Sequence, residues 1–250
     1  MSGHSKWATI KHKKGALDAK RGAVFTKLIK ELTVAAKNGG GNPDANPRLR
    51  TVLQKAKEAN MPADNIERAI KKGTGELPGV MYEEIQYEGY GPAGVAILIE
   101  VLTDNKNRTA SEVRSILDKK GGNMSGAGSV AWQFTKKGFL VVRKAGVDED
   151  KLMGIALDAG ASDFNTTDEF YEISTEPNDF EKVKKAVEDA KIATESAEVT
   201  KIAANNVKVA ELSAAKQILA LVEALEEHDD IQNVYSNVDI PDNILQELAK

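Results

Sequence analysis

The chain has 250 residues, of which 41% are hydrophobic and 29% are charged, and its formal net charge is −4 at pH 7. It contains no cysteine, which excludes disulfides, thiolate metal sites and cysteine nucleophiles. No run approaches the roughly 20 apolar residues that span a bilayer, so we expect a cytoplasmic protein without a membrane partner.

The two ends of the chain carry opposite charge. The first 72 residues hold sixteen Lys and Arg against six Asp and Glu, whereas the remaining 178 hold eighteen against thirty-two. This change of sign indicates a nucleic-acid-binding segment attached to an acidic body. The alternative is a basic surface that neutralises the acidic part of its own chain.

The basic end divides into an arm and a helical domain. Residues 1–22 contain too few large apolar side chains to offset the entropy of ordering, so we expect a flexible basic arm. Residues 23–75 predict three short helices with one small core. Asn46 and Pro47 supply an N-cap and a first helical residue.

The acidic end predicts two α/β domains, so the fold class is α+β. Residues 137–204 follow the β-α-β-β-α-β order of a ferredoxin-like domain. Residues 80–136 and 205–250 flank it and are expected to form a similar, discontinuous domain. The predicted fold is therefore a three-helix N-terminal domain followed by two α/β (ferredoxin-like) domains, one inserted into the other.

Two local predictions concern the discontinuous domain. Thr109-Ala-Ser-Glu112 reads as a capping box that opens a helix. Ser129–Thr135 reads as a strand with Trp132 and Phe134 on one side.

No arrangement of side chains indicates catalysis, a metal or a cofactor. His4 and His12 lie in the arm with no carboxylate cluster nearby, and His228 follows an expected helix end, where a partly positive ring is favourable. The pairs Glu83-Glu84 and Asp229-Asp230 are expected to be solvated. Gly121–Gly126 has the spacing of a phosphate-binding loop, but Ala127-Gly128 replaces the Lys-Ser/Thr that would hold phosphate and magnesium. We expect a protein that is not an enzyme.

Basic side chains on an arm and on helix faces bind phosphates through charge and counterion release. Trp7 can stack on an unpaired base, or it can anchor the arm against the helical domain. The candidate nucleic-acid-binding residues are Lys6, Trp7, Lys11, Lys13, Lys14, Lys20, Arg21, Lys27, Lys30, Arg48, Arg50 and Lys55.

A second candidate anion site is the expected helix N-terminus at Asn105, Lys106, Asn107 and Arg108, where backbone amides attract anions. The alternative is ordinary turn and capping chemistry. The acidic α/β domains are candidates for binding a protein partner.

Several stretches resemble the signature of the YebC family, and together they cover almost the whole chain. They are Gly3–Trp7, Ile10-Lys11, Lys14, Phe25–Glu31, Asn46–Arg50, Ala56-Lys57, Asn60–Ile66, Arg68–Ile70, Thr103–Thr109, the segment of Trp132 and Phe134, and Asp229–Tyr235.

The resemblance implies a cytoplasmic, non-enzymatic protein with a helical N-terminal domain and two nested α/β domains. Members of the family are described as DNA-binding transcriptional regulators. Others are described as ribosome-associated factors that aid translation through difficult stretches such as proline runs, including a mitochondrial translational activator of cytochrome c oxidase. A DNA-binding transcriptional regulator is our leading expectation. A factor that binds ribosomal RNA or the ribosome is the first alternative, and a protein-interaction module with a basic docking domain is the second.

Overall fold

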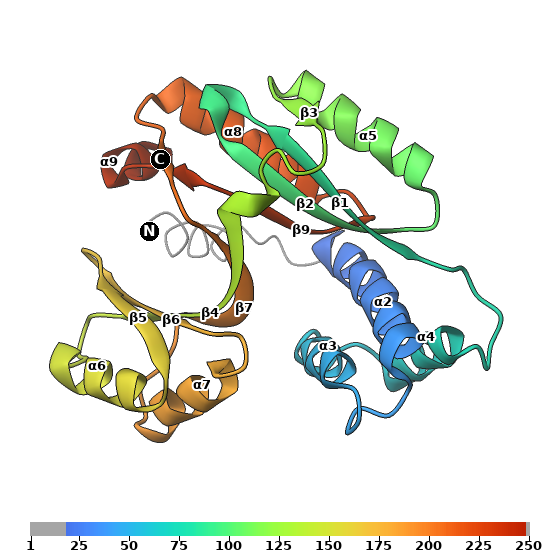
Figure 1. Ribbon diagram of the computed structural model, residues 1–250, viewed down its shortest axis with the longest axis horizontal. Helices are drawn as coiled ribbons and strands as arrows, with labels where there is room; N and C mark the ends of the chain where they lie inside the picture. The colour runs from blue at the N-terminus through green and yellow to red at the C-terminus, as the bar shows by residue number, and fades with distance from the viewer. Residues whose placement is uncertain (1–18, 249–250) are drawn as a thin grey trace. The chain divides into compact units, whose positions relative to one another are not determined.

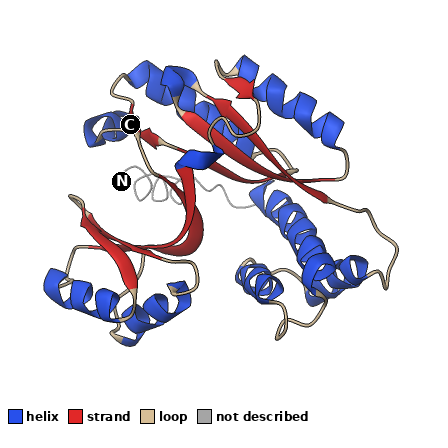
Figure 2. Cartoon of the chain, viewed as in Figure 1, coloured by secondary structure: helices blue, strands red, loops and turns tan. Residues whose placement is uncertain are grey.

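The structure is a computed structural model that describes residues 19–248. Within these residues the chain forms two compact units, one of residues 19–129 and 213–234 and the other of residues 130–212 and 235–248. Helices and sheets both contribute to the fold (Figures 1 and 2). None of the described helices is long and apolar enough to cross a membrane.

The first unit begins with three helices that share one core. They are α2 (Ala19–Gly39), α3 (Pro47–Glu58) and α4 (Ala63–Thr74). Leu32, Leu49 and Ala56 are fully buried in the core. Helix α4 approaches α2 closely at Gly73, where a Cβ would lie 2.3 Å from the carbonyl oxygen of Thr33. This contact requires glycine, because any larger residue would push the two helices apart.

Asn46 joins the end of α2 to the start of α3. Its side chain is 4% exposed, and its Oδ1 accepts a hydrogen bond from the Leu49 amide at 3.0 Å. Its Nδ2 donates to the carbonyl oxygens of Ala35 and Gly40, each at 2.8 Å. One side chain therefore caps α3 and also satisfies two carbonyls at the end of α2.

The same unit contains a four-stranded sheet with the strand order β3-β1-β2-β9, in which β1 is antiparallel to both β2 and β3. Its elements in chain order are β1 (Glu83–Tyr90), the 3-10 turn η1 (Pro92–Gly94), β2 (Ala96–Thr103), α5 (Lys106–Lys119), β3 (Asn123–Ser125), α8 (Leu212–Glu226) and β9 (Ile231–Ser236). Strand β2 lies between β1 and β9, and seven of its eight residues are buried, which explains its nearly continuous apolar sequence.

The predicted capping box at Thr109–Glu112 is wrong. Helix α5 begins at Lys106, and its N-cap is Asn105, whose side chain accepts a hydrogen bond from the Arg108 amide at 3.1 Å. Thr109 lies inside the first turn and is fully buried. Its hydroxyl contacts Asp230 instead of capping the helix.

The second unit contains the ferredoxin-like sheet, with the strand order β5-β6-β4-β7 and antiparallel neighbours. Its elements are β4 (Phe134–Arg143), α6 (Glu149–Asp158), β5 (Ala161–Thr166), β6 (Phe170–Thr175), α7 (Phe180–Asp189) and β7 (Ser196–Ala203). Helices α6 and α7 cover one face (Figure 1), where Leu140, Leu152, Ile173 and Val183 form a fully buried core.

The predicted strand at Ser129–Thr135 is also wrong. Ala131–Gln133 is a 3-10 turn, η2, closed by a hydrogen bond from the Gln133 amide to the Val130 carbonyl oxygen at 2.9 Å. Phe134 instead begins β4, which pairs with β7 along Phe134–Val141. Trp132 is left on the turn with 70% of its surface exposed.

The described residues contain further elements that the sequence did not predict: the short parallel strands β8 (Val207–Lys208) and β10 (Val238–Asp239), and helix α9 (Asp242–Leu248). The α+β fold class is confirmed. The predicted domain boundaries stay a prediction, since the compact units place the helical segment and the β1–β2 sheet together.

Replacing Asn46 with Ala removes the cap and both carbonyl contacts. We expect the Asn46→Ala variant to lose about 2 to 4 kcal/mol of unfolding free energy. Urea denaturation followed by far-UV circular dichroism measures the loss. The matched control is Asn42→Ala in the same loop, where the exposed side chain accepts one hydrogen bond from the Asp44 amide. Equal losses in the two variants would contradict the role given to Asn46.

Candidate nucleic-acid interface

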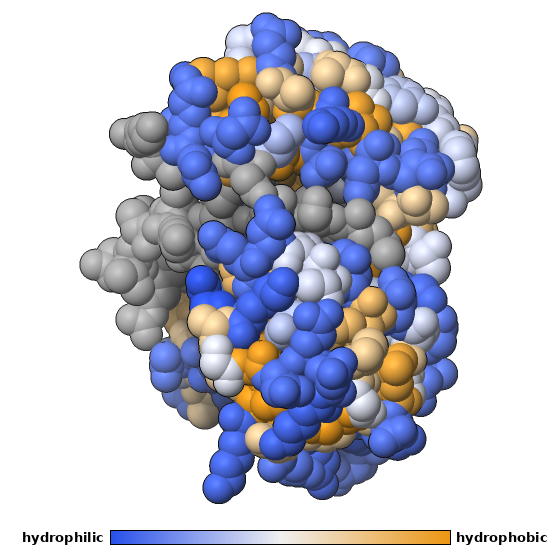
Figure 3. Space-filling view, turned by 90° about the vertical axis from the view of Figure 1, so that its left-hand side faces the viewer, coloured by the Kyte–Doolittle hydropathy of each residue, from blue (hydrophilic) through white to orange (hydrophobic). Residues whose placement is uncertain are grey.

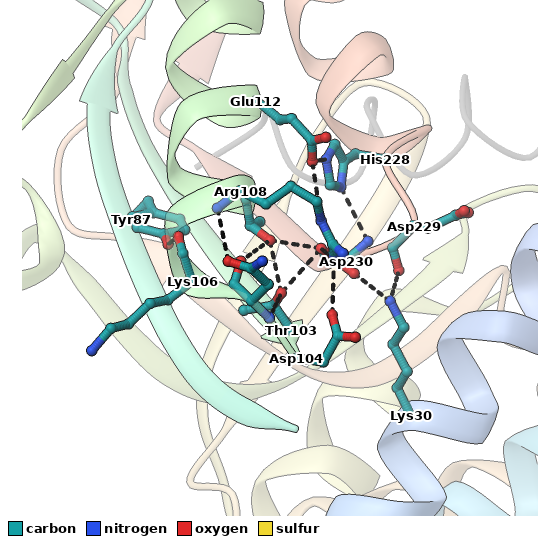
Figure 4. A network of polar contacts seen from close by, with 12 residues as sticks. Lys30, Tyr87, Thr103, Asp104, Lys106, Arg108, Glu112, His228, Asp229 and Asp230 are labelled. Carbon is teal, nitrogen blue, oxygen red and sulfur yellow. Dashed lines mark hydrogen bonds and ion pairs between the residues drawn. The ribbon is translucent and has the colours of Figure 1, made fainter. Parts of the chain in front are cut away.

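A buried carboxylate organises the first unit. Asp230 is 4% exposed and immediately precedes β9. Its Oδ2 accepts hydrogen bonds from the hydroxyls of Thr109 at 2.6 Å and Thr103 at 3.2 Å, and from the guanidinium of Arg108 at 2.8 Å. Figure 4 shows Thr103 and Arg108 pointing toward Asp230 from the end of β2 and the start of α5.

The fourth donor to Asp230 is Lys30 of α2. Its ammonium lies 2.5 Å from Asp230 Oδ1, and it also donates to the carbonyl oxygen of Asp229 at 3.0 Å. One turn earlier, Lys27 donates to the carbonyl oxygen of Glu226 at 2.6 Å. Two lysines of α2 therefore bind the end of α8 and the segment that follows it.

These contacts bear on the sequence predictions for Lys27, Lys30 and the Asp229-Asp230 pair. Lys30 is only 8% exposed, so it is not available to a phosphate in this structure, and Lys27 is partly buried with its ammonium engaged. Asp230 is buried, although the Asp229-Asp230 pair was expected to be solvated. Asp229 is exposed, as are both members of the Glu83-Glu84 pair.

The surroundings of Asp230 set its protonation. Burial alone would raise the pKa of this carboxyl, but the hydrogen bonds from Lys30, Thr109 and Arg108 outweigh burial and hold its pKa well below the ordinary value of 3.8. The same contact, together with one from Asp104 at 2.9 Å, raises the pKa of Arg108. Asp230 is therefore a permanent anion at neutral pH.

His228, Glu112 and Asp230 place one possible metal ligand each within 4.8 Å of one another. Each is already engaged. His228 Nε2 lies 2.9 Å from a carboxylate oxygen of Glu112, and its Nδ1 accepts from the Asp230 amide at 3.1 Å. The guanidinium of Arg108 also lies among the three side chains, which disfavours a second cation. We therefore interpret His228, Glu112 and Asp230 as partners in internal hydrogen bonds and ion pairs and not as metal ligands.

The second candidate anion site lies at the start of α5. Asn105 uses its side-chain oxygen as the N-cap, and Arg108 is paired with Asp104 and Asp230. Lys106 and Asn107 are exposed. Two of the four residues are thus committed to internal contacts, and anion binding here stays a prediction.

Arg48 is the next candidate along the chain. Its guanidinium makes two hydrogen bonds to the carboxylate of Glu84, at 2.8 and 3.0 Å. Asn38 donates to the same carboxylate at 3.0 Å. The hydrogen bond to Glu84 is the main cause of the raised pKa of Arg48. The contact joins the helical segment to β1 at an exposed position.

Helix α3 presents the remaining candidates in the described residues. Arg50 and Lys55 are exposed, and so is Lys57, which the sequence analysis did not select. The guanidinium of Arg50 donates through Nε to the carbonyl oxygen of Pro43 at 3.2 Å and through Nη2 to that of Asp44 at 3.0 Å, and the residue as a whole is exposed. Glu58 is the one acidic residue of the helix. Helical spacing alone would have placed Lys57 with the other exposed cations.

The candidate residues of the N-terminal arm lie outside the part of the chain that the structure describes. Lys6, Trp7, Lys11, Lys13 and Lys14 precede the described residues. Lys20 and Arg21 belong to the first turn of α2, but their side chains are not described. On the molecular face drawn in Figure 3, hydrophilic side chains cover most of the described surface and interrupt the hydrophobic areas.

Known proteins resemble this chain along its length. Residues 5–76 match the TACO1/YebC protein N-terminal domain, and residues 82–238 match the TACO1/YebC second and third domain. The chain belongs to the TACO1/YebC family.

Individual relatives are similar to this chain over almost its whole length. A "Probable transcriptional regulatory protein" of Desulfatibacillum aliphaticivorans is 59% identical, with 99% of this chain and 100% of the relative covered. One of the same name from Syntrophobacter fumaroxidans is 57% identical, with both chains covered completely. The crystal structure of a conserved hypothetical protein from Aquifex aeolicus is 45% identical with a TM-score of 0.78, covering 92% of this chain and 94% of that chain.

The buried cluster of this TACO1/YebC protein gives a stability prediction. Asp230→Asn removes the charge that neutralises Lys30, so we expect a loss of about 3 to 5 kcal/mol at pH 7, measured by urea denaturation. The control is Asp229→Asn, an exposed neighbour that should change stability by less than about 0.5 kcal/mol.

The pH dependence of the unfolding free energy, compared between wild type and Asp230→Asn, provides a second readout. The pKa of Asp230 is lower in the folded protein than in the unfolded chain. Its contribution to the unfolding free energy is therefore complete above about pH 5 and is lost progressively as pH falls below about 4. The stability difference between wild type and Asp230→Asn should therefore shrink in acid. A difference that stays constant from pH 7 to pH 3 would contradict this account.

Proposed function

We propose that this protein is a non-enzymatic, nucleic-acid-binding regulator of gene expression, and that its target is DNA in transcriptional control. The names of its relatives support the regulatory role, because several are called probable transcriptional regulatory proteins. The charge division of the chain supports a polyanionic target.

The observation that carries the proposal is the distribution of cations on the helical segment. Helix α2 directs Lys27 and Lys30 into the protein, where carbonyl and carboxylate oxygens hold them. Helix α3 instead exposes Arg50, Lys55 and Lys57. We assign phosphate contacts to these three side chains and to the lysines of the arm, and we leave Lys30 out.

A translational role is the second candidate, and the polar residues of α3 favour it. The hydroxyl of Thr51 donates to the Pro47 carbonyl oxygen, and the amide of Gln54 donates to Glu58, each at 3.1 Å. Thr51 and Gln54 are the uncharged side chains of this helix that could read base edges, and both make internal hydrogen bonds. Contacts through charge alone suit ribosomal RNA as well as duplex DNA.

The salt dependence of binding tests the α3 surface. Replacing Arg50, Lys55 and Lys57 together with Ala should lower affinity and reduce the log–log salt slope on duplex DNA by about 2 to 3, since each lost phosphate contact contributes about 0.9. Fluorescence anisotropy with labelled duplex between low and moderate salt gives the slope.

The control removes three exposed lysines elsewhere, Lys151, Lys182 and Lys185, and so changes net charge equally. An equal effect of both variants would mean that only overall charge matters, and would reject the α3 surface. Promoter footprints compared with co-sedimentation on ribosomes then separate the two candidate targets: ribosome binding without promoter protection would replace the DNA assignment with the translational one.

A further inference from the structure

The sheet of the ferredoxin-like domain ends in two edge strands, β5 and β7, that differ in regularity. Strand β5 has a register shift between Ala161 and Asp163, an irregularity that interrupts an edge. Strand β7 pairs with β4 along all of Ser196–Ala203 without such a shift. A regular edge strand presents a row of backbone donors and acceptors that can pair with a further strand. Strand β7 is therefore the edge better suited to accept one.

The outer edge of β7 is open along most of its length. Within the described part of the chain, no hydrogen bond joins the outer edge of residues 196–200 to another segment. Glu198 and Val199 are both exposed, and Val199 has 38% of its surface accessible. The middle of this edge thus combines available backbone groups with an exposed apolar side chain.

Val199 has no side chain opposite it in β4, because its neighbour there is Gly138. The fold requires glycine at this position, since a Cβ on Gly138 would lie 2.2 Å from Thr175 Oγ1 and 2.7 Å from Phe180 Cβ. Pairs of side chains on neighbouring strands are a main source of stability in sheets. A strand added on the outer side of β7 would supply the cross-strand contact that β4 does not give to Val199.

We propose that β7 pairs with β7 of a second copy of this chain, antiparallel and around a two-fold axis at Val199. A two-fold axis through an antiparallel pair places one residue directly opposite its own copy, so that residue fixes the register. An axis at Glu198 or at Lys201 would set two like charges directly opposite each other, which is destabilising. An axis at Val199 instead brings two exposed apolar side chains together.

The charged side chains of β7 are compatible with this register. Glu198 lies opposite Thr200 of the second copy. Lys201 lies opposite Ala197 of the second copy and diagonally from its Glu195, which has the opposite charge. An axis at Thr200 would instead place Lys201 diagonally from its own copy. The pairing joins two four-stranded sheets into one and buries the free edge of each, and the inference stands independently of the proposed function.

Cysteine cross-linking tests the pairing and its register, because the natural chain has no cysteine. In the proposed dimer the Cα atoms of the two copies of Val199 lie about 5 Å apart, within disulfide range, whereas those of Glu198 lie about 8 Å apart. Both residues are exposed, so Glu198→Cys is a matched control. Under mild oxidation, we expect Val199→Cys to form the disulfide-linked dimer about tenfold faster than the control. Equal rates would overturn the proposed pairing.

Sedimentation equilibrium of the full-length protein gives a second readout without cross-linking. We expect the average mass to rise toward that of two chains at about 100 μM protein, a concentration at which weak dimers form. Val199→Lys sets two positive charges opposite each other and should raise the dimer Kd about tenfold, whereas Val199→Thr should keep the dimer. Thermal melting followed by circular dichroism checks that both variants fold. A monomeric wild type at this concentration, or equal Kd values for the two variants, would contradict the proposal.

Discussion

The need to neutralise one buried carboxylate ties together the parts of the first unit. Asp230 lies where water cannot solvate it, and an isolated charge there would be prohibitively costly. Its hydrogen-bond donors come from α2, from the end of β2 and from the first turn of α5. Satisfying this one side chain therefore fixes the helical segment, the central strand and the following helix against the start of β9.

This constraint divides the positive charge of the first 72 residues into two groups. Lys27 and Lys30 neutralise or bind the acidic part of their own chain, which was the alternative explanation of the charge pattern. Arg50, Lys55 and Lys57 remain exposed on α3, as a polyanion-binding surface requires. The two explanations thus apply to different faces of one helical segment.

Local signals predicted the local structure well. Caps, glycines and helical spacing identified α2, α3 and α4, and the order of strands and helices identified the ferredoxin-like domain. The strand predicted at Ser129–Thr135 failed because alternating apolar residues also fit a turn that leads into a strand. The Lys30–Asp230 pair could not be predicted, because 200 residues separate its partners and nothing nearby shows which of two adjacent aspartates is buried. The arm residues of the candidate site remain predictions, and Lys57 was missed although its helical position was available.

The central claim is that Lys30 and Asp230 stabilise the fold as a pair and that Lys30 does not serve as a phosphate ligand. A double-mutant cycle with Lys30→Met and Asp230→Leu tests this claim most directly, with unfolding free energies measured by urea denaturation. The account predicts a coupling energy above about 1.5 kcal/mol, because each single variant leaves a buried charge and the double variant leaves none. A coupling energy below about 0.5 kcal/mol, within the range of independent sites, would contradict it.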